Sequence, residues 1–271
     1  MDCELCNFKN PKGTATAVII RDNKLLLLKR NEEPFKGMWD FPGGYMNEKE
    51  TPEETVRREV KEELGIDARG CTFIKSQPGD GYWKTETYPI LSNFFLVDIG
   101  DKEPVLSGEN SEYKWVPLKN LDKEMISWDS NQELAKWLRQ TFSFDFERVK
   151  ELIAQLDSSA VVNELSLYRA ILNGYLATRY DCEKLIGMGW IFPRQTMLRK
   201  QAVVEDMVVD GAYRGKGLGR EILDDLVKWA KDEGVEVIEL TSNPARIAAN
   251  ELYKRYGFQL YPTNRYLFKV E

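Results

Sequence analysis

The sequence predicts an α/β (α+β) protein of two domains that follow each other without a flexible linker. Its 271 residues exceed what a single hydrophobic core usually holds. Short β-rich runs and amphipathic helical runs occur along the whole chain, and the pattern of elements changes near residues 141–145. We therefore expect one domain over residues 1–143 and a second over residues 144–271.

The first half contains a helix whose two ends are both signalled. Thr51 stands in the N-cap position, Pro52 fits the first helical turn, and Gly65 is a C-terminal stop for the run PEETVRREVKEEL. Upstream, residues 14–30 form two β-rich runs around the turn RDNK, which predicts a hairpin. Further strands are expected at 71–76, 88–98 and 113–116, with a short helix near 131–140.

The second half begins with helices and then turns to strands. Its patterns predict helices at 146–156 and 161–172, strands at 174–180, 184–192 and 201–209, a helix at 217–233, a strand at 235–241, a helix at 245–256, and terminal strands at 258–261 and 265–270.

Composition argues against several classes of function. A net charge of −6 gives no basic footprint for nucleic acid or an anionic membrane. No apolar run approaches the roughly 18 residues of a membrane span, and the polar start MDCELCNFKN is no signal peptide. The 4 cysteines favour a reducing, cytoplasmic setting. Histidine is absent, so chemistry falls to carboxylates, hydroxyls, thiols and amines.

Three carboxylates crowd one side of the predicted helix. Glu59, Glu62 and Glu63 are spaced i, i+3 and i+4, and like charges at that spacing destabilise a helix by a few tenths of a kcal/mol per pair. Bound Mg²⁺ would reverse this repulsion, because hard divalent cations take oxygen ligands and pair carboxylates with substrate phosphates. The alternative is an ordinary solvated acidic helix.

The surrounding residues favour the metal hypothesis. The chain reads Gly44, five residues, Glu50, seven residues, then Arg58-Glu59-Val60-Lys61-Glu62-Glu63-Leu64-Gly65-Ile66. Across residues 10–140 it therefore resembles the Nudix hydrolase family, whose signature is G-x5-E-x7-R-E-U-x-E-E-x-G-U with U aliphatic. The resemblance implies an α/β/α sandwich and metal-dependent hydrolysis of a nucleoside diphosphate linked to another moiety.

The resemblance also implies roles for single residues. Glu59, Glu62 and Glu63 would bind Mg²⁺ or Mn²⁺, Arg58 would orient a glutamate, Glu50 would support the loop electrostatically, and the Gly44 carbonyl is a further candidate ligand. Outside the signature, Glu112 in SGENSEYKW is a candidate extra ligand or base, with an ordinary loop glutamate as the alternative.

Substrate signals are weaker. A dinucleotide or ADP-ribose-type diphosphate is the leading hypothesis, and a nucleoside triphosphate is the second. Residues 1–10, CELC included, resemble half of a zinc ribbon; because a structural zinc site needs four ligands, zinc is not predicted. The aromatic residues Trp39, Tyr82, Trp83 and Tyr88 could stack on a base or could simply pack.

A glycine-rich turn joins a strand to a helix in the second half. Its residues are Arg214, Gly215, Lys216, Gly217, Leu218 and Gly219. Glycines let the backbone approach a phosphate, and the N-terminus of a helix offers free N–H donors. The spacing R-x-x-G-x-G differs from the dinucleotide pattern G-x-G-x-x-G.

Together with LYKRYGF near the end, this turn resembles the GNAT N-acetyltransferase family across residues 146–271. The resemblance implies that the turn holds the pyrophosphate of acetyl-CoA and that Met207, Val208 and Val209 pair with its pantetheine arm. Tyr253 would protonate the leaving thiolate, with a core tyrosine as the alternative, and Glu205 would take the proton of the amine. Many members carry asparagine where this chain has Ala248; Asn250 is the substitute candidate. Acceptor contacts would come from Glu164, Tyr168 and Arg169.

Three hypotheses of function follow. The first is a bifunctional enzyme that hydrolyses a nucleotide diphosphate and acetylates a small amine or a protein amine. The second is an acetyltransferase regulated by a non-hydrolytic, nucleotide-sensing module, and the intact set of glutamates argues against it. The third makes one half a degenerate dimerisation platform, so a homodimer stays open.

Overall fold

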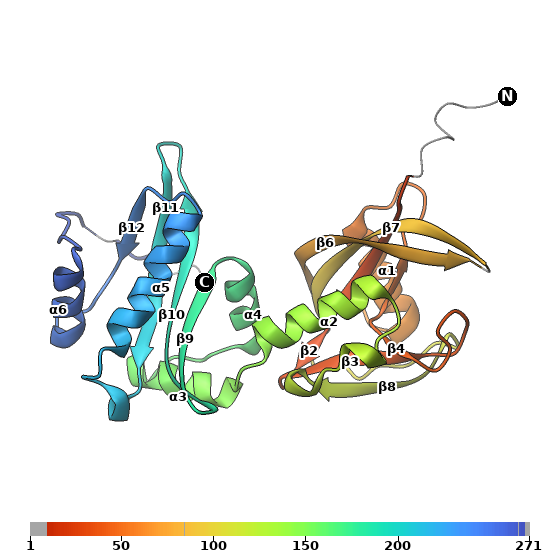
Figure 1. The fold of residues 1–271 in the computed structure, drawn as a ribbon, viewed down its shortest axis with the longest axis horizontal. Coiled ribbons are helices and arrows are strands. Elements are labelled where there is room, and N and C mark those ends of the chain that lie inside the picture. The colour runs from red at the N-terminus through yellow and green to blue at the C-terminus, as the bar shows by residue number, and fades with distance from the viewer. Residues whose placement is uncertain (1–9, 84, 265, 269–271) are drawn as a thin grey trace. The chain divides into compact units, whose positions relative to one another are not determined.

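The computed structural model describes residues 10–83, 85–264 and 266–268, and it divides into two compact units (Figure 1). The first unit comprises residues 1–146 together with 163–172, and the second comprises 147–162 together with 173–271. The cysteine pair of the predicted ribbon remnant lies outside the described residues. Among those residues no helix is long and apolar enough to cross a membrane.

The first unit contains two sheets and two long helices. One sheet has the strand order β5-β1-β7-β6, and the other has the order β2-β3-β4 with β8 also paired to β3. The elements are β1 (Lys12–Val18), β2 (Ile20–Arg21), β3 (Lys24–Arg30), β4 (Trp39–Asp40), β5 (Gly43–Tyr45), α1 (Pro52–Leu64), β6 (Gly70–Trp83), β7 (Glu86–Asp98), β8 (Asn110–Pro117) and α2 (Asp129–Phe142).

Helix α1 is fixed by its caps and by its apolar face. Thr51 and Glu54 form a reciprocal capping box, and Gly65 ends the helix with a φ of 69°. Val56, Val60 and Leu64 are fully buried against β1, β3 and β7. Of the glutamates in this helix, Glu62 is 59% exposed, whereas Glu63 is buried beside the apolar face. The predicted helix and both of its ends are confirmed.

The predicted hairpin over residues 14–30 is only partly correct. Asp22 and Asn23 have φ values of 52° and 57° and form the turn between β2 and β3. Only Ile20 and Arg21 pair with β3 across that turn, because β1 runs parallel to β7 in the other sheet. The first of the two predicted β-rich runs therefore contributes a strand to each sheet, β1 to one and β2 to the other.

Helix α4 (Glu164–Leu172) belongs to the first unit, although segments of the second unit precede and follow it in sequence. The Glu164 carboxylate accepts hydrogen bonds from the backbone N–H groups of Asp22 and Asn23 at 2.9 and 2.6 Å. Tyr168 is fully buried, and its ring centroid lies 4.7 Å from that of Phe142. Arg169 Nε lies 3.3 Å from Thr72 Oγ1. All three side chains of α4 therefore contact the first unit, whereas we had expected them to contact the acetyl acceptor.

The second unit is built on one mixed sheet. Its elements are α3 (Phe146–Leu156), β9 (Tyr175–Asp181), β10 (Lys184–Gln195), β11 (Lys200–Val209), α5 (Leu218–Asp232), β12 (Val237–Leu240) and α6 (Ile247–Tyr256). The strand order is β12-β11-β10-β9, antiparallel except for the parallel pair β11/β12. Helix α5 packs across this sheet (Figure 1).

Strand β11 is paired on both sides along only part of its length. Its residues 201–204 pair with β12, whereas its pairing with β10 continues to Val209. Asp206 has a φ of 50° beside an irregularity in the β10 register. Within the described chain, residues 206–209 have no pairing partner in β12 and form an edge of the sheet that is unpaired on that side.

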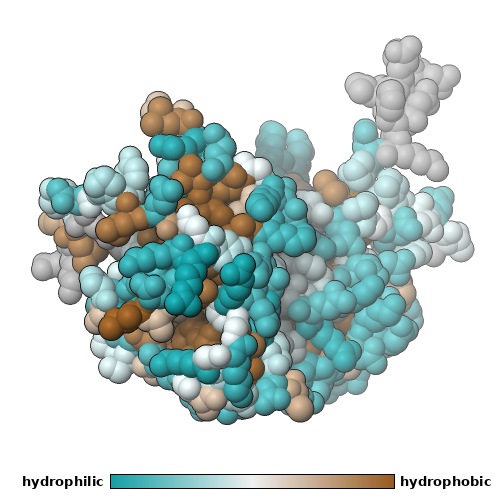
Figure 2. All heavy atoms as spheres, turned by 60° about the vertical axis from the view of Figure 1, so that its left-hand side comes forward, coloured by the Kyte–Doolittle hydropathy of each residue, from teal (hydrophilic) through white to brown (hydrophobic). Residues whose placement is uncertain are grey.

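The terminal strand predicted at 258–261 is wrong, because the structure forms no strand there. A strand needs a hydrogen-bonding partner, and no described strand pairs with this segment. An apolar pattern alone is therefore not enough to form a strand. Of the strand predicted at 265–270, residues 266–268 are described and form no strand, and the other residues lie outside the described part of the chain. The second unit consequently exposes apolar side chains (Figure 2), among them Ile247, Leu260, Tyr261, Tyr266, Leu267 and Phe268.

The docking of α4 can be tested by stability. Replacing Tyr168 by alanine leaves a cavity under α4, and we expect the free energy of unfolding of the first unit to fall by about 3–5 kcal/mol. Chemical denaturation gives the magnitude, and hydrogen exchange shows which unit is affected. Tyr261→Ala is the matched control, because this side chain is 79% exposed and its loss should change stability by less than about 0.5 kcal/mol. Faster exchange confined to the second unit would contradict the assignment.

Candidate active sites

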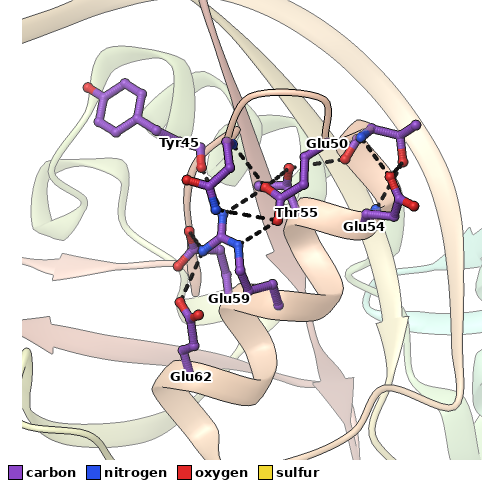
Figure 3. A network of polar contacts seen from close by, with 9 residues as sticks. Tyr45, Glu50, Glu54, Thr55, Glu59 and Glu62 are labelled. Atoms are coloured by element: carbon purple, nitrogen blue, oxygen red, sulfur yellow. Dashed lines mark hydrogen bonds and ion pairs between the residues drawn. The ribbon is translucent and has the colours of Figure 1, made fainter.

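Arg58 donates hydrogen bonds to three carboxylates around α1, those of Glu50, Glu59 and Glu62, which are labelled in Figure 3. Its Nε and Nη2 donate to the two oxygens of Glu50 at 2.7 and 3.0 Å, and Nη2 also donates to the Tyr45 carbonyl at 2.9 Å. Its Nη1 donates to Glu59 at 2.7 Å and to Glu62 at 3.0 Å. A guanidinium has five N–H donors, so these five contacts use all of them.

Two of the glutamates approach the glycine pair that opens β5. The N–H of Gly43 donates to Glu63 Oε2 at 2.8 Å. A Cβ atom placed on Gly44 would lie 2.3 Å from Glu59 Oε1, so only glycine lets this carboxylate reach the strand. The turn before α1 and the helix itself thereby gather Glu59, Glu63 and the backbone of Gly44 in one place.

The charges of these carboxylates are unequally compensated. The hydrogen bond from Arg58 lowers the pKa of Glu50 to about 2. Burial raises the pKa of Glu63 to about 8, because its partners Gly43 and Asn110 are neutral and Glu59 adds repulsion. Burial also raises the pKa of Glu59, against the pull of Arg58. Glu63 therefore lacks a cationic partner, whereas Glu59 shares the Arg58 guanidinium with Glu50 and Glu62.

The chemistry of this donor set fits a hard divalent cation. In the described part of the chain, no group of three or more histidine, cysteine, aspartate or glutamate side chains converges as a ligand set. Glu59 and Glu62 instead turn to Arg58, and Glu63 turns to Gly43. Glu62 is 59% exposed, so its carboxylate can change rotamer toward an ion without a shift of the backbone. The carbonyl of Gly44 stays a predicted ligand.

Glu112 lies on β8 opposite Lys29. Its carboxylate accepts a hydrogen bond from Lys29 Nζ at 2.6 Å, and it stays a predicted ligand. Sequence analysis missed Asn110, whose Nδ2 donates to Glu63 Oε1 at 2.9 Å, and Glu109, whose charge contributes to the raised pKa of Glu59. Both residues precede Glu112 in the polar segment SGENSEYKW, so the sequence could have indicated them.

Aromatic side chains gather in the first unit. Phe35, Tyr82 and Trp128 contact one another with ring centroids 5.1–5.9 Å apart, and Tyr82 is stacked on Trp128. Of the aromatics named from sequence, Trp39 lies 3.8 Å from Lys114 Nζ, and Tyr88 exchanges a hydrogen bond with Tyr45 at 2.7 Å. Sequence analysis missed Phe35 and Trp128.

The glycine-rich turn of the second unit leads from β11 into α5. Gly215 and Gly217 have φ values of 79° and 87°, and added Cβ atoms there would meet nothing within 4 Å. Gly217 is the N-cap of α5 and provides no side-chain cap, so the first N–H groups of α5 lack that partner. Arg214 Nε donates to the Val209 carbonyl at 3.0 Å. Lys216 lies 4.8 Å from the ring of Tyr213.

A buried ion pair holds the start of this turn. Asp210 pairs with Arg148 of α3 and accepts a hydrogen bond from the Ala212 N–H at 2.9 Å. Arg148 Nε also donates to the Leu185 carbonyl at 2.8 Å. Through Arg148, helix α3 and strand β10 hold Asp210 at the start of the glycine-rich turn. Removing one partner of this buried pair would leave an uncompensated charge.

The structure brings Tyr253 of α6 to the unpaired edge of β11. Its hydroxyl lies 3.9 Å from the Met207 sulfur. Burial raises the pKa of Tyr253, and the negative charge of Glu205 adds to that rise. A phenol with its ordinary pKa of 10 is already protonated at neutral pH, and the raised pKa makes Tyr253 hold this proton more firmly. Asn250 instead donates to the Asn243 carbonyl at 3.0 Å, so its amide holds the loop before α6.

Comparison with known proteins finds one family for each half of the chain. Residues 11–138 match the family model of the NUDIX domain, and residues 131–258 match that of the Acetyltransferase (GNAT) family. An ADP-ribose pyrophosphatase of Methanocaldococcus jannaschii is 32% identical over 135 residues, which are 49% of this chain and 76% of that protein. An 8-oxo-dGTP diphosphatase of Buchnera aphidicola is 30% identical over 105 residues, 38% of this chain and 75% of that protein.

The second unit has relatives of its own. A mycothiol acetyltransferase of Propionibacterium freudenreichii is 31% identical over 91 residues, which are 34% of this chain and 29% of that protein. The chain belongs to the Nudix family. It joins a Nudix hydrolase domain to a GNAT acetyltransferase domain.

The buried charge of Glu63 predicts a pH dependence of stability. Without metal, the folded chain keeps the proton on Glu63 up to about pH 8, whereas the unfolded chain releases it near the ordinary value of 4.5. The folded state then binds more protons in this window, so this contribution to stability falls as the pH rises from 4.5 to 8. Divalent cations displace the proton, and the thermal shift with Mn²⁺ should therefore grow with pH.

Melting temperatures of metal-free and Mn²⁺-loaded protein between pH 5 and pH 9 measure both effects. Glu63→Gln is the control, because it removes the titrating group and should flatten the metal-free curve. Parallel pH curves for wild type and Glu63→Gln would contradict the prediction.

Proposed function

We propose that the first unit hydrolyses a nucleoside diphosphate linked to another moiety, with Mg²⁺ or Mn²⁺ held by Glu59, Glu62 and Glu63. The observation that carries the proposal is the Arg58 fork, which gathers Glu50, Glu59 and Glu62 beside the glycines of β5. An ordinary solvated acidic helix would not explain why a glycine lies opposite Glu59. It would also not explain why Glu63 is buried without a cationic partner.

The residues of this chain would have distinct parts in the reaction. A bound cation would neutralise pyrophosphate oxygens and lower the pKa of an attacking water. Arg58 holds Glu50 ionised and positions Glu59 and Glu62, while Gly43 and Asn110 fix the buried carboxylate of Glu63. A carboxylate of this set would take the proton of the water. The products would be two monophosphate esters.

The substrate is best sought among ADP-ribose and dinucleotides. The relative from Methanocaldococcus jannaschii is named an ADP-ribose pyrophosphatase, and the half-exposed aromatic cluster of Phe35, Tyr82 and Trp128 offers a stacking surface for a base. A nucleoside triphosphate is the second candidate, since the relative from Buchnera aphidicola is named an 8-oxo-dGTP diphosphatase.

Glu62→Gln tests the hydrolase. We expect kcat for ADP-ribose or NADH with Mg²⁺ to fall at least about 100-fold, because the variant loses a carboxylate ligand. Phosphorus NMR identifies the products, and dGTP tests the second candidate. Glu53→Gln is the matched control: it changes the same charge on α1 but pairs only with Arg57, so it should retain activity. Nucleotide binding without any cleavage by wild type would favour the sensor hypothesis.

We propose that the second unit transfers an acetyl group from acetyl-CoA to an amine. The observation that carries this proposal is the approach of Tyr253 to Met207 at the unpaired edge of β11. The edge formed by Met207, Val208 and Val209 would pair with the amides of the pantetheine arm. The backbone from Arg214 to Gly219, with Gly215 and Gly217 in left-handed conformations, would receive the pyrophosphate.

The transfer needs two proton movements. The neutral amine attacks the thioester carbon, the C–N bond forms, and the C–S bond breaks. Tyr253 would give its proton to the leaving sulfur, and Glu205 would accept the proton of the amine directly or through water. Holding both substrates in place would provide most of the acceleration. The acceptor is a small amine or a protein amine.

Tyr253→Phe tests this assignment. The variant lacks the proton donor, and we expect kcat of acetyl transfer to fall about 100-fold with little change in the affinity for CoA. Release of free CoA thiol measures the rate, with glucosamine, spermidine and a lysine-containing peptide as acceptors. Tyr256→Phe on the same helix is the control and should be nearly silent. A wild-type rate in Tyr253→Phe would remove Tyr253 from the mechanism.

A further inference from the structure

Two aromatic side chains of β10 stack on the face of the second sheet that is turned away from α5. The ring centroids of Trp190 and Phe192 lie 4.6 Å apart, and the ring planes are 21° from parallel. Successive residues of a strand point to opposite faces, and Ile191 between them is fully buried in the cluster that contains Ile222 and Leu226 of α5. The stacked pair therefore lies on the other face, where both rings are half-buried.

The pairing of β10 with β11 places these rings beside the proposed proton acceptor. Trp190 is directly opposite Glu205, and Phe192 follows two residues further along the same face. Directly opposed side chains of an antiparallel pair share a face, with Cβ atoms roughly 4.5–5.5 Å apart. Two residues beyond Glu205, the Met207 sulfur lies 3.9 Å from the Tyr253 hydroxyl. The aromatic pair and both proposed proton-transfer groups therefore lie around one segment of β11.

We propose that Trp190 and Phe192 bind the acetyl acceptor, and that this acceptor is a primary amine joined by a short alkyl chain to an aromatic ring. The inference rests on the proposed acetyltransferase function, in which Glu205 accepts the proton of the amine. It narrows the acceptor from small and protein amines in general to one chemical class.

The two kinds of side chain fit the two ends of such an amine. An alkylamine with a pKa near that of lysine, about 10.4, arrives as an ammonium ion at neutral pH. The Glu205 carboxylate and the electron-rich face of a tryptophan both attract a cation, and an aromatic ring packs on aromatic side chains in offset or edge-to-face arrangements. Because Trp190 and Glu205 are cross-strand neighbours, a short chain between ring and nitrogen is enough to reach both.

The polar residues further along this face are bonded to one another. Arg194 Nη2 donates to Gln201 Oε1 at 2.9 Å and pairs with Glu239, and Gln201 Nε2 donates to Glu239 Oε1 at 3.2 Å. These groups therefore offer little to the hydroxyl groups of an amino sugar or to the additional ammonium groups of a polyamine. The lining of this face favours an aromatic acceptor over either.

Initial rates with 2-phenylethylamine, tryptamine, glucosamine and spermidine at saturating acetyl-CoA test the class of acceptor. We expect wild-type kcat/KM for the two aromatic amines to exceed that for the other two at least about 10-fold. Trp190→Leu should raise KM for 2-phenylethylamine about 10-fold without changing KM for acetyl-CoA, and Trp190→Phe should recover most of the affinity. Phe192→Leu should act in the same direction as Trp190→Leu.

Trp229→Leu is the matched control. Trp229 stacks on Tyr175 with ring centroids 6.3 Å apart, but this pair packs against the cluster on the α5 side of the sheet. The control removes an equal ring from the opposite face, so KM for 2-phenylethylamine should stay at its wild-type value.

A ligand-observed NMR titration of 2-phenylethylamine into the full-length protein separates this inference from the proposed function. Wild-type affinity in Trp190→Leu, or in Phe192→Leu if Trp190→Leu does not fold, would overturn the inference. A higher wild-type kcat/KM for glucosamine or spermidine than for both aromatic amines would overturn it as well. Acetylation of none of the four amines by wild type would overturn the proposed function, and the titration would then decide whether the aromatic amine site stands without it.

Discussion

A single guanidinium makes the crowded carboxylates of α1 compatible with a folded helix. Arg58 directs all five of its N–H donors to Glu50, Glu59, Glu62 and the Tyr45 carbonyl. Lysine has three donors on one nitrogen and could not span this set. The compensation stops short of Glu63, which is buried with neutral partners. Burial raises the pKa of this carboxyl to about 8, so it becomes charged only above about pH 8 or when a cation displaces its proton.

How far the sequence predicts this site depends on the distance between its parts along the chain. The helix, its caps and the glycine that faces Glu59 all lie between Gly43 and Gly65, where fixed spacing determines geometry. Asn110 reaches Glu63 only through the pairing of β8 with β3 and through the hydrogen bonds from Val105 and Ser107 to the end of α1. Spacing says nothing about such tertiary contacts, so the sequence did not indicate Asn110, and Glu112 stays a prediction.

The second unit shows the same limit in its sheet. The strands from β9 to β12 and helix α5 follow from periodicity, and the left-handed glycines of the turn follow from R-x-x-G-x-G. The early end of β12 does not follow from periodicity. Strand β12 pairs with only four residues of β11, and this number depends on where the chain turns out of the sheet. That early end is nevertheless what leaves residues 206–209 without a partner in β12. The proposed site for the pantetheine arm therefore lies at an interruption of regular pairing, which no periodic pattern records.

Helix α4 has a consequence for any attempt to separate the two activities. The chain leaves the first unit after α2, forms α3 in the second, returns to form α4 in the first, and then builds β9 in the second. A fragment beginning at residue 144 would carry α4 without the turn at Asp22 and Asn23 that satisfies Glu164, and it would expose Tyr168. The complementary fragment, residues 1–143, would lose the packing of Tyr168 against Phe142. Since both fragments would expose surface that the whole chain buries, loss of activity after such a cut would report damage at α4 rather than communication between the sites.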